Sequence, residues 1–309
     1  MDATPLKGEV EQPRAESEVG VAVPRPFAPR CGVSVLVLSF NEEANIERCL
    51  RSLWQMSDDV WVVDSGSTDR TVEIARSAGA HVVVKDWPGY ARQWNWGLSE
   101  LPFRYPFVMI HASDEQIPEA WAREFKGVMD SDNRPDMILT SFRFWWMGRP
   151  VLHGNYTKTY IVKAGRRELM RYEDRSCNEH IPHKGQIYKM KERYEHRDAK
   201  EVDRWIEKHI RYARLEAEER RLARVNSRAS RPSLLKEGQR VRWLRENVYD
   251  RLPIFVRPAS YFAYRYVAGA GWRDGLTGSI FHYLHSFWFP LLIDVFELEQ
   301  RLSAEHKVD

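Results

Sequence analysis

Acidic and polar side chains follow three apolar runs of strand length in the first half of the chain. These side chains are Ser39, Asn41 and Glu42 at the end of the first run, Asp64, Ser67 and Asp69 at the end of the second, and Asp114 and Glu115 after the third. Carboxylates grouped in this way suit hydrogen bonding to a base or ribose and the binding of a divalent cation against a diphosphate. The pattern predicts a nucleotide site, although Asn41, Ser67 and Asp69 taken singly are also typical of helix caps and turns.

The runs that carry these side chains alternate with helical periodicity. Apolar strand-like runs cover residues 33–40, 60–64, 80–86 and 107–112. Apolar residues at helical spacing cover residues 41–53, 71–78, 91–101 and 118–129, with Asn41 as the expected cap of the first helix and Ser67 or Thr68 as that of the second. This alternation predicts an α/β fold with a mainly parallel sheet covered on both faces. Ligands of such sheets bind outside the carboxyl ends of the strands, where the three polar groups would converge.

Several other classes of protein are excluded by what the sequence lacks. It has no G-x-x-x-x-G-K-[ST] and no G-x-G-x-x-G after the first strand, which argues against P-loop and dinucleotide chemistry. The pairs His180/His183 and His282/His285 lack the flanking Glu and the spacing of a zinc peptidase. Three distant cysteines suit a reducing compartment, and a net charge of +3 provides no chain-wide basic field for nucleic acid.

Four blocks occur in order along the chain: VSVLVLSFNEEANIERCLRSL, VWVVDSGSTDRTVEIA, GYARQWNWGL and IHASDEQIP. Together they resemble family 2 nucleotide-sugar glycosyltransferases, in particular the branch that contains bacterial lipopolysaccharide-core and exopolysaccharide transferases. The resemblance covers Val33 to Ile187 and, more loosely, the stretch RLPIFVRPASYFAYRYVAGAGWRDGLTG. It implies a GT-A fold, a Rossmann-like sheet flanked by helices, and inverting transfer from a nucleoside diphosphate sugar such as a UDP-sugar.

The resemblance also implies roles for individual residues. Asn41, Glu42 and Asp64 match nucleotide-contacting positions, and Asp114 matches the second acid of the Asp-x-Asp metal motif. The first acid of that motif falls on Ala112. One protein carboxylate, diphosphate oxygens and water would then hold Mg²⁺ or Mn²⁺.

The segment 172–180 is expected to supply the catalytic base. Inverting transfer is one in-line displacement, so it needs one carboxylate that takes the proton of the acceptor hydroxyl. Glu179 matches the base position of the family, with Asp174 as the alternative, and surface ion pairing is the competing interpretation of both. We also expect Arg92 and Gln93 to reach the donor, and Trp94 either to cover a sugar face or to pack in the core.

The chain changes character after about residue 195. We expect a disordered leader over 1–30, a catalytic domain over 31–195 and a helical, amphipathic C-terminal extension over 196–309. Between Arg220 and Arg245 there are nine basic residues and one acidic residue, and thirteen aromatic residues follow between Tyr249 and Phe296. Basic residues are attracted to anionic lipid, and Trp and Tyr favour the headgroup level.

This composition predicts an extension that lies on an anionic membrane surface. The most apolar stretch, Ser279 to Phe296, is interrupted by two histidines, a proline and Asp294, so no spanning helix is expected. The alternative is a charged helix beside a packed helical subdomain or a homo-oligomer contact. We therefore expect a peripheral protein on the cytoplasmic face of the inner membrane, acting on a lipid-linked glycan acceptor. The competing functions are transfer to a polyprenyl phosphate and a catalytically inactive scaffold, which Ala112 suggests.

Overall fold

The computed structural model describes residues 31–156, 159–173, 180–225, 249 and 252–305. The chain forms two units, one made of residues up to Arg143 together with 158–199, and one made of 144–157 together with the chain from Lys200 onward. The leader expected over 1–30 lies outside the described residues. The chain passes into the second unit close to the expected boundary near 195, but segment 144–157, which we expected in the catalytic domain, belongs to the second unit.

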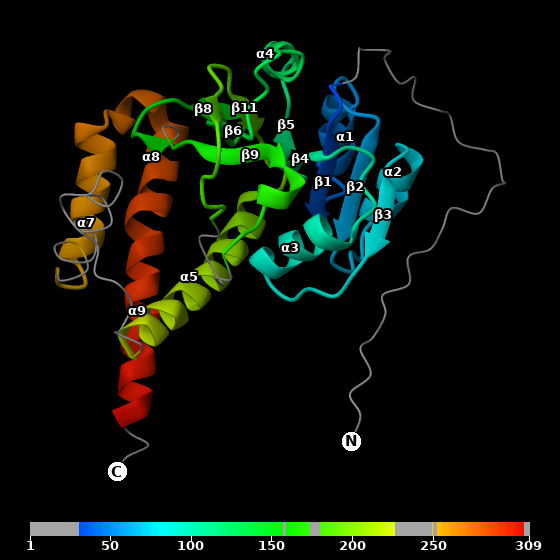
Figure 1. Cartoon of the computed structure of the whole chain (residues 1–309). Helices are drawn as coiled ribbons and strands as arrows, with labels where there is room; N and C mark the ends of the chain where they lie inside the picture. Colours follow the sequence, from blue (N-terminus) through cyan, green and yellow to red (C-terminus); the bar gives the residue numbers. More distant parts are fainter. Residues whose placement is uncertain (1–30, 157–158, 174–179, 226–248, 250–251, 306–309) are drawn as a thin grey trace, which may run out of the picture. The chain divides into compact units, whose positions relative to one another are not determined.

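The first unit is built on a seven-stranded, mainly parallel sheet (Figure 1). Its strands are β1 (Ser34–Ser39), β2 (Asp59–Asp64), β3 (His81–Val84), β4 (Phe107–Ala112), β6 (Met137–Thr140), β9 (Ile161–Arg166) and β10 (Ile187–Lys189). They lie in the order β10-β6-β9-β4-β1-β2-β3, and only β9 runs antiparallel to its neighbours. The predicted α/β class is confirmed.

Helices cover both faces of this sheet. The helices are α1 (Ile46–Leu53), α2 (Thr71–Ser77), α3 (Tyr90–Glu100) and α4 (Glu119–Met129). Successive side chains of β1 point to opposite faces, so Val35 and Val37 join the core under α1, α2 and α4, whereas Leu36 packs with Leu98 of α3 on the other face. Because β1 is buried on both faces, it shows a continuous apolar run in the sequence.

The first two helices begin later than the sequence predicted. Helix α1 begins at Ile46 rather than beside Asn41, and α2 begins at Thr71 with Arg70 before it and no side-chain cap. Asn41 has a left-handed backbone (φ 53°) and bonds to the loop after β2, so it cannot cap a helix that starts directly after it. The expectation that Asn41 caps the first helix and Ser67 or Thr68 the second is therefore wrong.

A short antiparallel pair adds a second layer at the end of β4. Strand β5 (Glu115–Gln116) pairs with β11 (Tyr194–His196), which places His196 opposite Glu115. Strand β11 lies about eighty residues further along the chain, so this pairing brings a distant segment to the end of β4.

The second unit is mainly helical. The helices are α5 (Val202–Val225), α7 (Val256–Ala263), α8 (Gly275–Tyr283) and α9 (Phe289–Glu305), with π-helical turns η4 (Tyr264–Ala268) and η6 (Leu284–Trp288) and a 3₁₀ turn η5 (Gly271–Asp274). Helices α5 and α9 pack against one another at an angle, with Ala213, Ala217 and Ile293 in their shared core (Figure 1). Strand β7 (Phe142–Trp146) enters this unit from the first and forms a hairpin with β8 (Arg149–Val151). Phe144 packs on Phe281 of α8, which explains why segment 144–157 belongs to this unit.

None of the described helices combines the length and the apolar character that crossing a membrane requires.

Candidate functional site

Asp64 organises the turn that follows β2. Its side chain is buried at the carboxyl end of the strand, where Oδ2 accepts hydrogen bonds from Ser39 Oγ (2.7 Å) and Ser67 Oγ (2.6 Å). Its Oδ1 accepts the backbone N–H groups of Gly66 (3.0 Å) and Ser67 (2.7 Å). Gly66 has φ +83°, which favours glycine over residues with a Cβ. The structure thus brings Ser39, Asp64 and Ser67 together, and both oxygens of the carboxylate are engaged in holding the turn.

Asn41 joins the loop after β1 to the loop after β2. Its backbone N–H donates to Ser67 Oγ (2.8 Å), and its Oδ1 accepts the backbone N–H of Thr68 (2.8 Å). Asp69 adds a second link, because its Oδ2 accepts the backbone N–H of Glu43 (3.2 Å). The polar residues expected as caps therefore bond across the two loops. We call these linked loops, residues 40–43 and 65–69 at the carboxyl ends of β1 and β2, the ridge.

Glu42 of this ridge is buried. Its backbone N–H donates to Thr71 Oγ1 (2.7 Å), and its Oε2 accepts Nδ2 of Asn45 (2.8 Å). Asn45 also donates to Asp198 Oδ1 (2.8 Å) and accepts the backbone N–H of Ala199 (2.8 Å). Glu42 is thereby connected through Asn45 to the chain that follows β11.

A buried group of charges lies at the carboxyl end of β4. Glu115 Oε2 accepts the backbone N–H of Ala112 (2.7 Å), forms an ion pair with Lys163 of β9, and lies 3.3 Å from Nδ1 of His111. Lys163 is 2% exposed and Glu115 6% exposed. The ammonium of Lys163 also lies 4.1 Å from the ring centre of Tyr194. This ion pair fixes the turn that carries Asp114.

Burial and charge shift the pKa values of this group in opposite directions. Burial and the neighbouring Lys163 lower the pKa of His111 to about 3, so its imidazole is neutral at physiological pH. Burial alone would raise the pKa of Glu115, but the ammonium of Lys163 holds it below its ordinary value. Burial, with Glu115 close by, raises the pKa of Tyr194 well above its usual range. The cluster therefore contains one anion, one cation and two neutral rings.

Asp114 is paired with a histidine that the sequence analysis did not single out. Its Oδ2 lies 3.4 Å from Nε2 of His196, which β11 brings to this place. Arg48 of α1 helps to hold this segment, because its Nη2 donates to the carbonyl of Arg197 (2.8 Å). The lone His196 has no neighbour in the sequence that signals a site, so only the strand pairing reveals it.

Asp114 and His196 fit a cation that is bound mainly by its substrate. Within the described ranges, no group of three His, Cys, Asp or Glu side chains is placed to hold a metal ion. Magnesium commonly keeps several waters and is bound through one or two carboxylates plus substrate phosphates. One carboxylate with a neighbouring imidazole meets that requirement when a diphosphate supplies further oxygens.

Helix α3 carries the remaining donor residues that the sequence predicted. Trp94 stacks on Tyr172, with ring centres 6.0 Å apart, and packs with the core on that face of the sheet. Gln93 is fully buried, and its amide makes no hydrogen bond within the described part of the chain. Arg92 lines a cavity of about 410 Å³ together with Tyr172 and Glu173.

That cavity borders the segment expected to hold the base. Asn95 of α3 clamps the backbone of Tyr172, donating to its carbonyl (3.0 Å) and accepting its N–H (2.8 Å). Pro182 contributes to the same lining from the far side of the segment. In the sequence, Asp174 and Glu179 fall between Tyr172 and Pro182, and both are outside the described residues.

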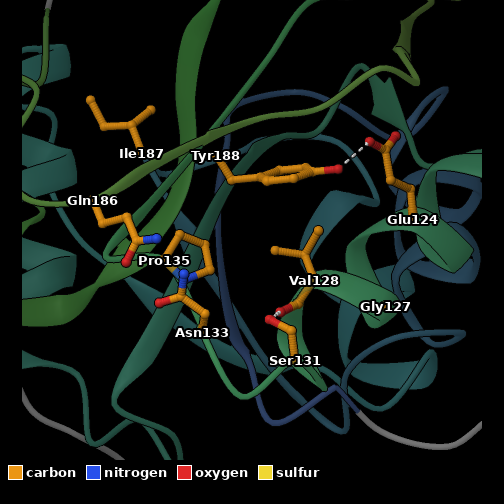
Figure 2. Close-up of a pocket in the computed structure, with 9 residues that line it drawn as sticks. All are labelled: Glu124, Gly127, Val128, Ser131, Asn133, Pro135, Gln186, Ile187 and Tyr188. Carbon is orange, nitrogen blue, oxygen red and sulfur yellow. Dashed lines mark hydrogen bonds between the residues drawn. The ribbon is translucent and has the colours of Figure 1, made fainter.

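A further cavity of about 450 Å³ lies away from the carboxyl ends of the strands. It is lined by the end of α4 and by the amino ends of β6 and β10. Figure 2 shows the hydroxyl of Tyr188 directed at Glu124, to which it donates a hydrogen bond of 3.1 Å. None of the residues predicted for the site lines this cavity, so we do not assign it to the nucleotide.

Comparison with known proteins agrees with this arrangement. The model of glycosyl transferase family 2 matches residues 34–190. An uncharacterized glycosyltransferase of Rickettsia bellii (strain RML369-C) is 33% identical over 129 residues, which is 42% of this chain and 42% of the relative. The chain therefore matches less than half of the length of that relative.

Two further matches are a relative aligned over most of the chain and a solved structure. The lipopolysaccharide core biosynthesis glycosyltransferase LpsC of Rhizobium meliloti (strain 1021) is 24% identical over 259 residues, covering 82% of this chain and 87% of LpsC. The crystal structure of glucosyl-3-phosphoglycerate synthase from Mycobacterium tuberculosis, in complex with Mn²⁺, UDP and glucosyl-3-phosphoglycerate, superposes with a TM-score of 0.33 at 22% identity, covering 44% of this chain and 57% of the synthase.

The family model spans the whole interval from β1 to β10, and it includes the interlocked loops after β1 and β2 and the acidic turn after β4. The resemblance noted in the sequence blocks is therefore confirmed. On this evidence the chain belongs to glycosyl transferase family 2.

Proposed function

We propose that this chain transfers one sugar, with inversion, from a nucleoside diphosphate sugar to a hydroxyl of a lipid-linked or lipopolysaccharide-type glycan. The observation that carries the proposal is the ridge formed by the loops after β1 and β2, with the buried turn of Asp114 at the end of the adjacent strand β4. Open α/β sheets bind ligands outside the carboxyl ends of their strands. A UDP-sugar is the first donor to test.

In this proposal the ridge binds the nucleotide. Asp64 holds the Gly66–Ser67 turn, so that the exposed part of the ridge keeps one shape before the ligand arrives. Asn41, Glu42 and Asp69 keep the neighbouring loop against it. Such preorganisation lowers the entropy lost when a ligand binds.

Asp114 and His196 would hold Mg²⁺ or Mn²⁺ beside the diphosphate. The cation, when bound, supplies positive charge that stabilises the leaving diphosphate. Lys163 stays paired with Glu115 and acts through it, because this ion pair positions the turn on which Asp114 lies.

The chemical step needs a base in the segment after Tyr172. The acceptor oxygen bonds to the anomeric carbon, the bond from that carbon to the diphosphate oxygen breaks, and the hydroxyl proton moves to a carboxylate. We propose Glu179 as this carboxylate, with Asp174 as the alternative. Arg92 lines the cavity beside Tyr172, and we propose that its guanidinium contacts the donor diphosphate.

The acceptor class is proposed from a relative that matches most of the chain. LpsC is named as a lipopolysaccharide core biosynthesis glycosyltransferase, and the alignment extends over most of both chains. An acceptor of this kind is attached to lipid, which agrees with the peripheral, cytoplasmic-face location expected from the sequence. The basic stretch on which that expectation rested lies mostly in 226–248, outside the described residues.

The proposal is tested with the purified chain and a panel of UDP-sugars. Release of UDP and transfer to a rough lipopolysaccharide acceptor are measured with and without Mg²⁺ or Mn²⁺. We expect UDP to raise the melting temperature, because a ligand that binds only the folded state stabilises it. A chain that binds nucleoside diphosphates but consumes no donor would be the inactive, nucleotide-sugar-binding scaffold that Ala112 suggests.

The variant Glu179→Gln separates the two enzymatic alternatives. Loss of transfer to a hydroxyl acceptor together with retained transfer to a polyprenyl phosphate would identify the second reaction, because a phosphate acceptor is already anionic and needs no base. Asp174→Asn, a matched change in the same segment, shows which of the two carboxylates is the base.

A further inference from the structure

The two arginines of the helix formed by α7 and η4 are both turned inward. Arg257 is 5% exposed, with its Nε donating to Asp294 Oδ2 (3.0 Å) and its Nη2 bonded to the other carboxylate oxygen. Arg265 is also 5% exposed, with Nη1 donating to the hydroxyl of Tyr261 (2.9 Å) and the guanidinium 5.0 Å from the ring centre of Tyr156. The charges of this helix are therefore kept inside the second unit.

The outward stripe of the same helix is apolar. Its large members are Phe255 (69% exposed), Val256 (49%), Tyr264 (53%) and Val267 (67%). They recur at the spacing of one helix face, with exposed alanines between them. This is the reverse of the usual surface helix, which turns its charged face to water.

Helix α8 and the turn before it repeat this inversion. Trp272, Leu276 and Tyr283 are 58%, 78% and 50% exposed and lie on one face of the helix. The opposite face carries His282, whose Nε2 lies 3.2 Å from Asp274 Oδ2, and both of these side chains are shielded from solvent. Among residues 252–283, all of which the structure describes, Arg273 is the only exposed residue with a formal charge.

An apolar surface of this extent indicates a binding partner, because soluble proteins rarely leave such patches in water. We call it the outer apolar face, and its members are Phe255, Val256, Tyr264, Val267, Trp272, Leu276, Ile280 and Tyr283. Two of its members are tyrosines and one is a tryptophan, and these rings favour the level of lipid headgroups. The basic excess between Arg220 and Arg245, together with Arg273, is complementary to anionic lipid.

We propose that the outer apolar face inserts into the headgroup and upper acyl region of an anionic bilayer, with α7 and α8 lying on the membrane and not crossing it. Arg257 and Asp274 are buried in internal pairs, and Arg265 is buried against Tyr261 and Tyr156. The one exposed charge between residues 252 and 283, Arg273, is of the sign that anionic headgroups attract. The proposal deepens the proposed function, which gives the enzyme a lipid-linked acceptor, but lipid binding itself does not depend on sugar transfer.

The test is co-sedimentation of the full-length protein with vesicles of phosphatidylcholine alone and of phosphatidylcholine with 30% phosphatidylglycerol. We expect stronger binding to the anionic vesicles and partial release as salt rises, because screening weakens the electrostatic attraction but not the apolar contact. Leu276→Glu and Val267→Glu should each weaken binding roughly tenfold or more. Leu215→Glu, an exposed leucine of α5 outside the face, is the matched control and should bind as the wild type does.

Insertion is measured by quenching with brominated lipid. The difference in quenching between the wild type and Trp272→Phe isolates this one tryptophan, and we expect Trp272 to be quenched. Unchanged vesicle binding of Leu276→Glu would overturn the proposal. A second result would also overturn it: the wild type does not bind vesicles, and light scattering shows a dimer that is lost in Leu276→Glu. The face would then be an interface between two copies.

Circular dichroism melting of each variant separates loss of lipid binding from loss of folding. UDP binding, measured on the same proteins without lipid, separates this proposal from the proposed function. Binding to vesicles without binding to UDP would support the lipid-binding face and contradict the proposed transferase. Binding to UDP without binding to vesicles would support the transferase and contradict the lipid-binding face.

Discussion

The two units distribute charge in opposite ways. In the first unit, apolar side chains fill both faces of the sheet, and carboxylates gather at the carboxyl ends of β1, β2 and β4. From α7 to α8 of the second unit, the charged side chains other than Arg273 are buried and many of the large apolar ones are exposed. In both units a buried charge needs a partner. The difference is in the proposed ligand: a charged nucleotide and cation for the first unit, and the lipid bilayer for the outer apolar face of the second.

The buried ion pairs of the two units have correspondingly different consequences. Glu115 and Lys163 hold the turn of Asp114 at the site. Arg257 and Asp294 join α7 to α9 and remove both charges from the outer apolar face. One pair shapes a polar site, and the other makes an apolar surface possible.

The largest effect is expected when one partner of a buried pair is removed. Lys163→Met leaves Glu115 buried without the cation that it pairs with, and we expect the free energy of unfolding to fall by about 3–5 kcal/mol in urea titrations. The double variant Lys163→Met/Glu115→Gln should recover much of this loss, because no unpaired charge remains. Equal stability of the single and double variants would show that the pair does not carry this role.

Asp114→Asn should reduce metal-dependent transfer by more than the roughly 10- to 100-fold that removing an outer-shell partner of a metal usually costs. Initial rates over a range of Mg²⁺ and Mn²⁺ concentrations measure this effect. Asp130→Asn, at the end of α4, serves as control. Full activity of Asp114→Asn in Mg²⁺ would refute the metal assignment.

Asp64→Ala should weaken UDP binding by about 1–3 kcal/mol, because the two serine hydroxyls and two backbone N–H groups that it accepts lose their partner. Ser39→Ala removes only one of these donors and should have a smaller effect. Calorimetry with UDP distinguishes the two variants. The same affinity for Asp64→Ala as for the wild type would exclude this aspartate from the nucleotide site.

The smallest effect concerns pH and the second unit. His209 stacks on Trp205, and burial lowers its pKa to about 4. The unfolded chain takes up this proton near pH 6.5 and the folded chain only near pH 4, so the stability from neutral His209 is lost as pH falls between these values. We expect His209→Gln to reduce the stability lost between pH 6.5 and 5 by about 1–2 kcal/mol.

Thermal unfolding at several pH values measures this difference. His81→Gln, at an exposed position on β3, should leave the slope unchanged. The same slope for His209→Gln as for the wild type would mean that His209 is protonated in the folded state as easily as in the unfolded one.

The fold class of the first unit could be predicted from the local pattern of apolar residues in the sequence. Apolar runs of strand length that alternate with helical periodicity lead to a parallel sheet, and parallel strands necessarily bring their carboxyl ends to one edge. Ser39, Asp64 and Ser67 were for this reason expected at one place, and the structure joins them. The helix starts were mispredicted, because the local sequence does not show whether a polar residue such as Asn41 caps the next helix or bonds to another loop.

The charged partners of the site and the polarity of the second unit depend on contacts between distant segments. Lys163 reaches Glu115 because β9 pairs antiparallel with β4, and His196 reaches Asp114 because β11 pairs with β5. Helical spacing groups residues into faces, but it does not say which face is turned inward. In this helix the direction is set by distant residues: Asp294 of α9 pairs with Arg257, and the ring of Tyr156 lies against the guanidinium of Arg265. A partner inside the unit stabilises a buried charge, and the apolar stripe is then left outside.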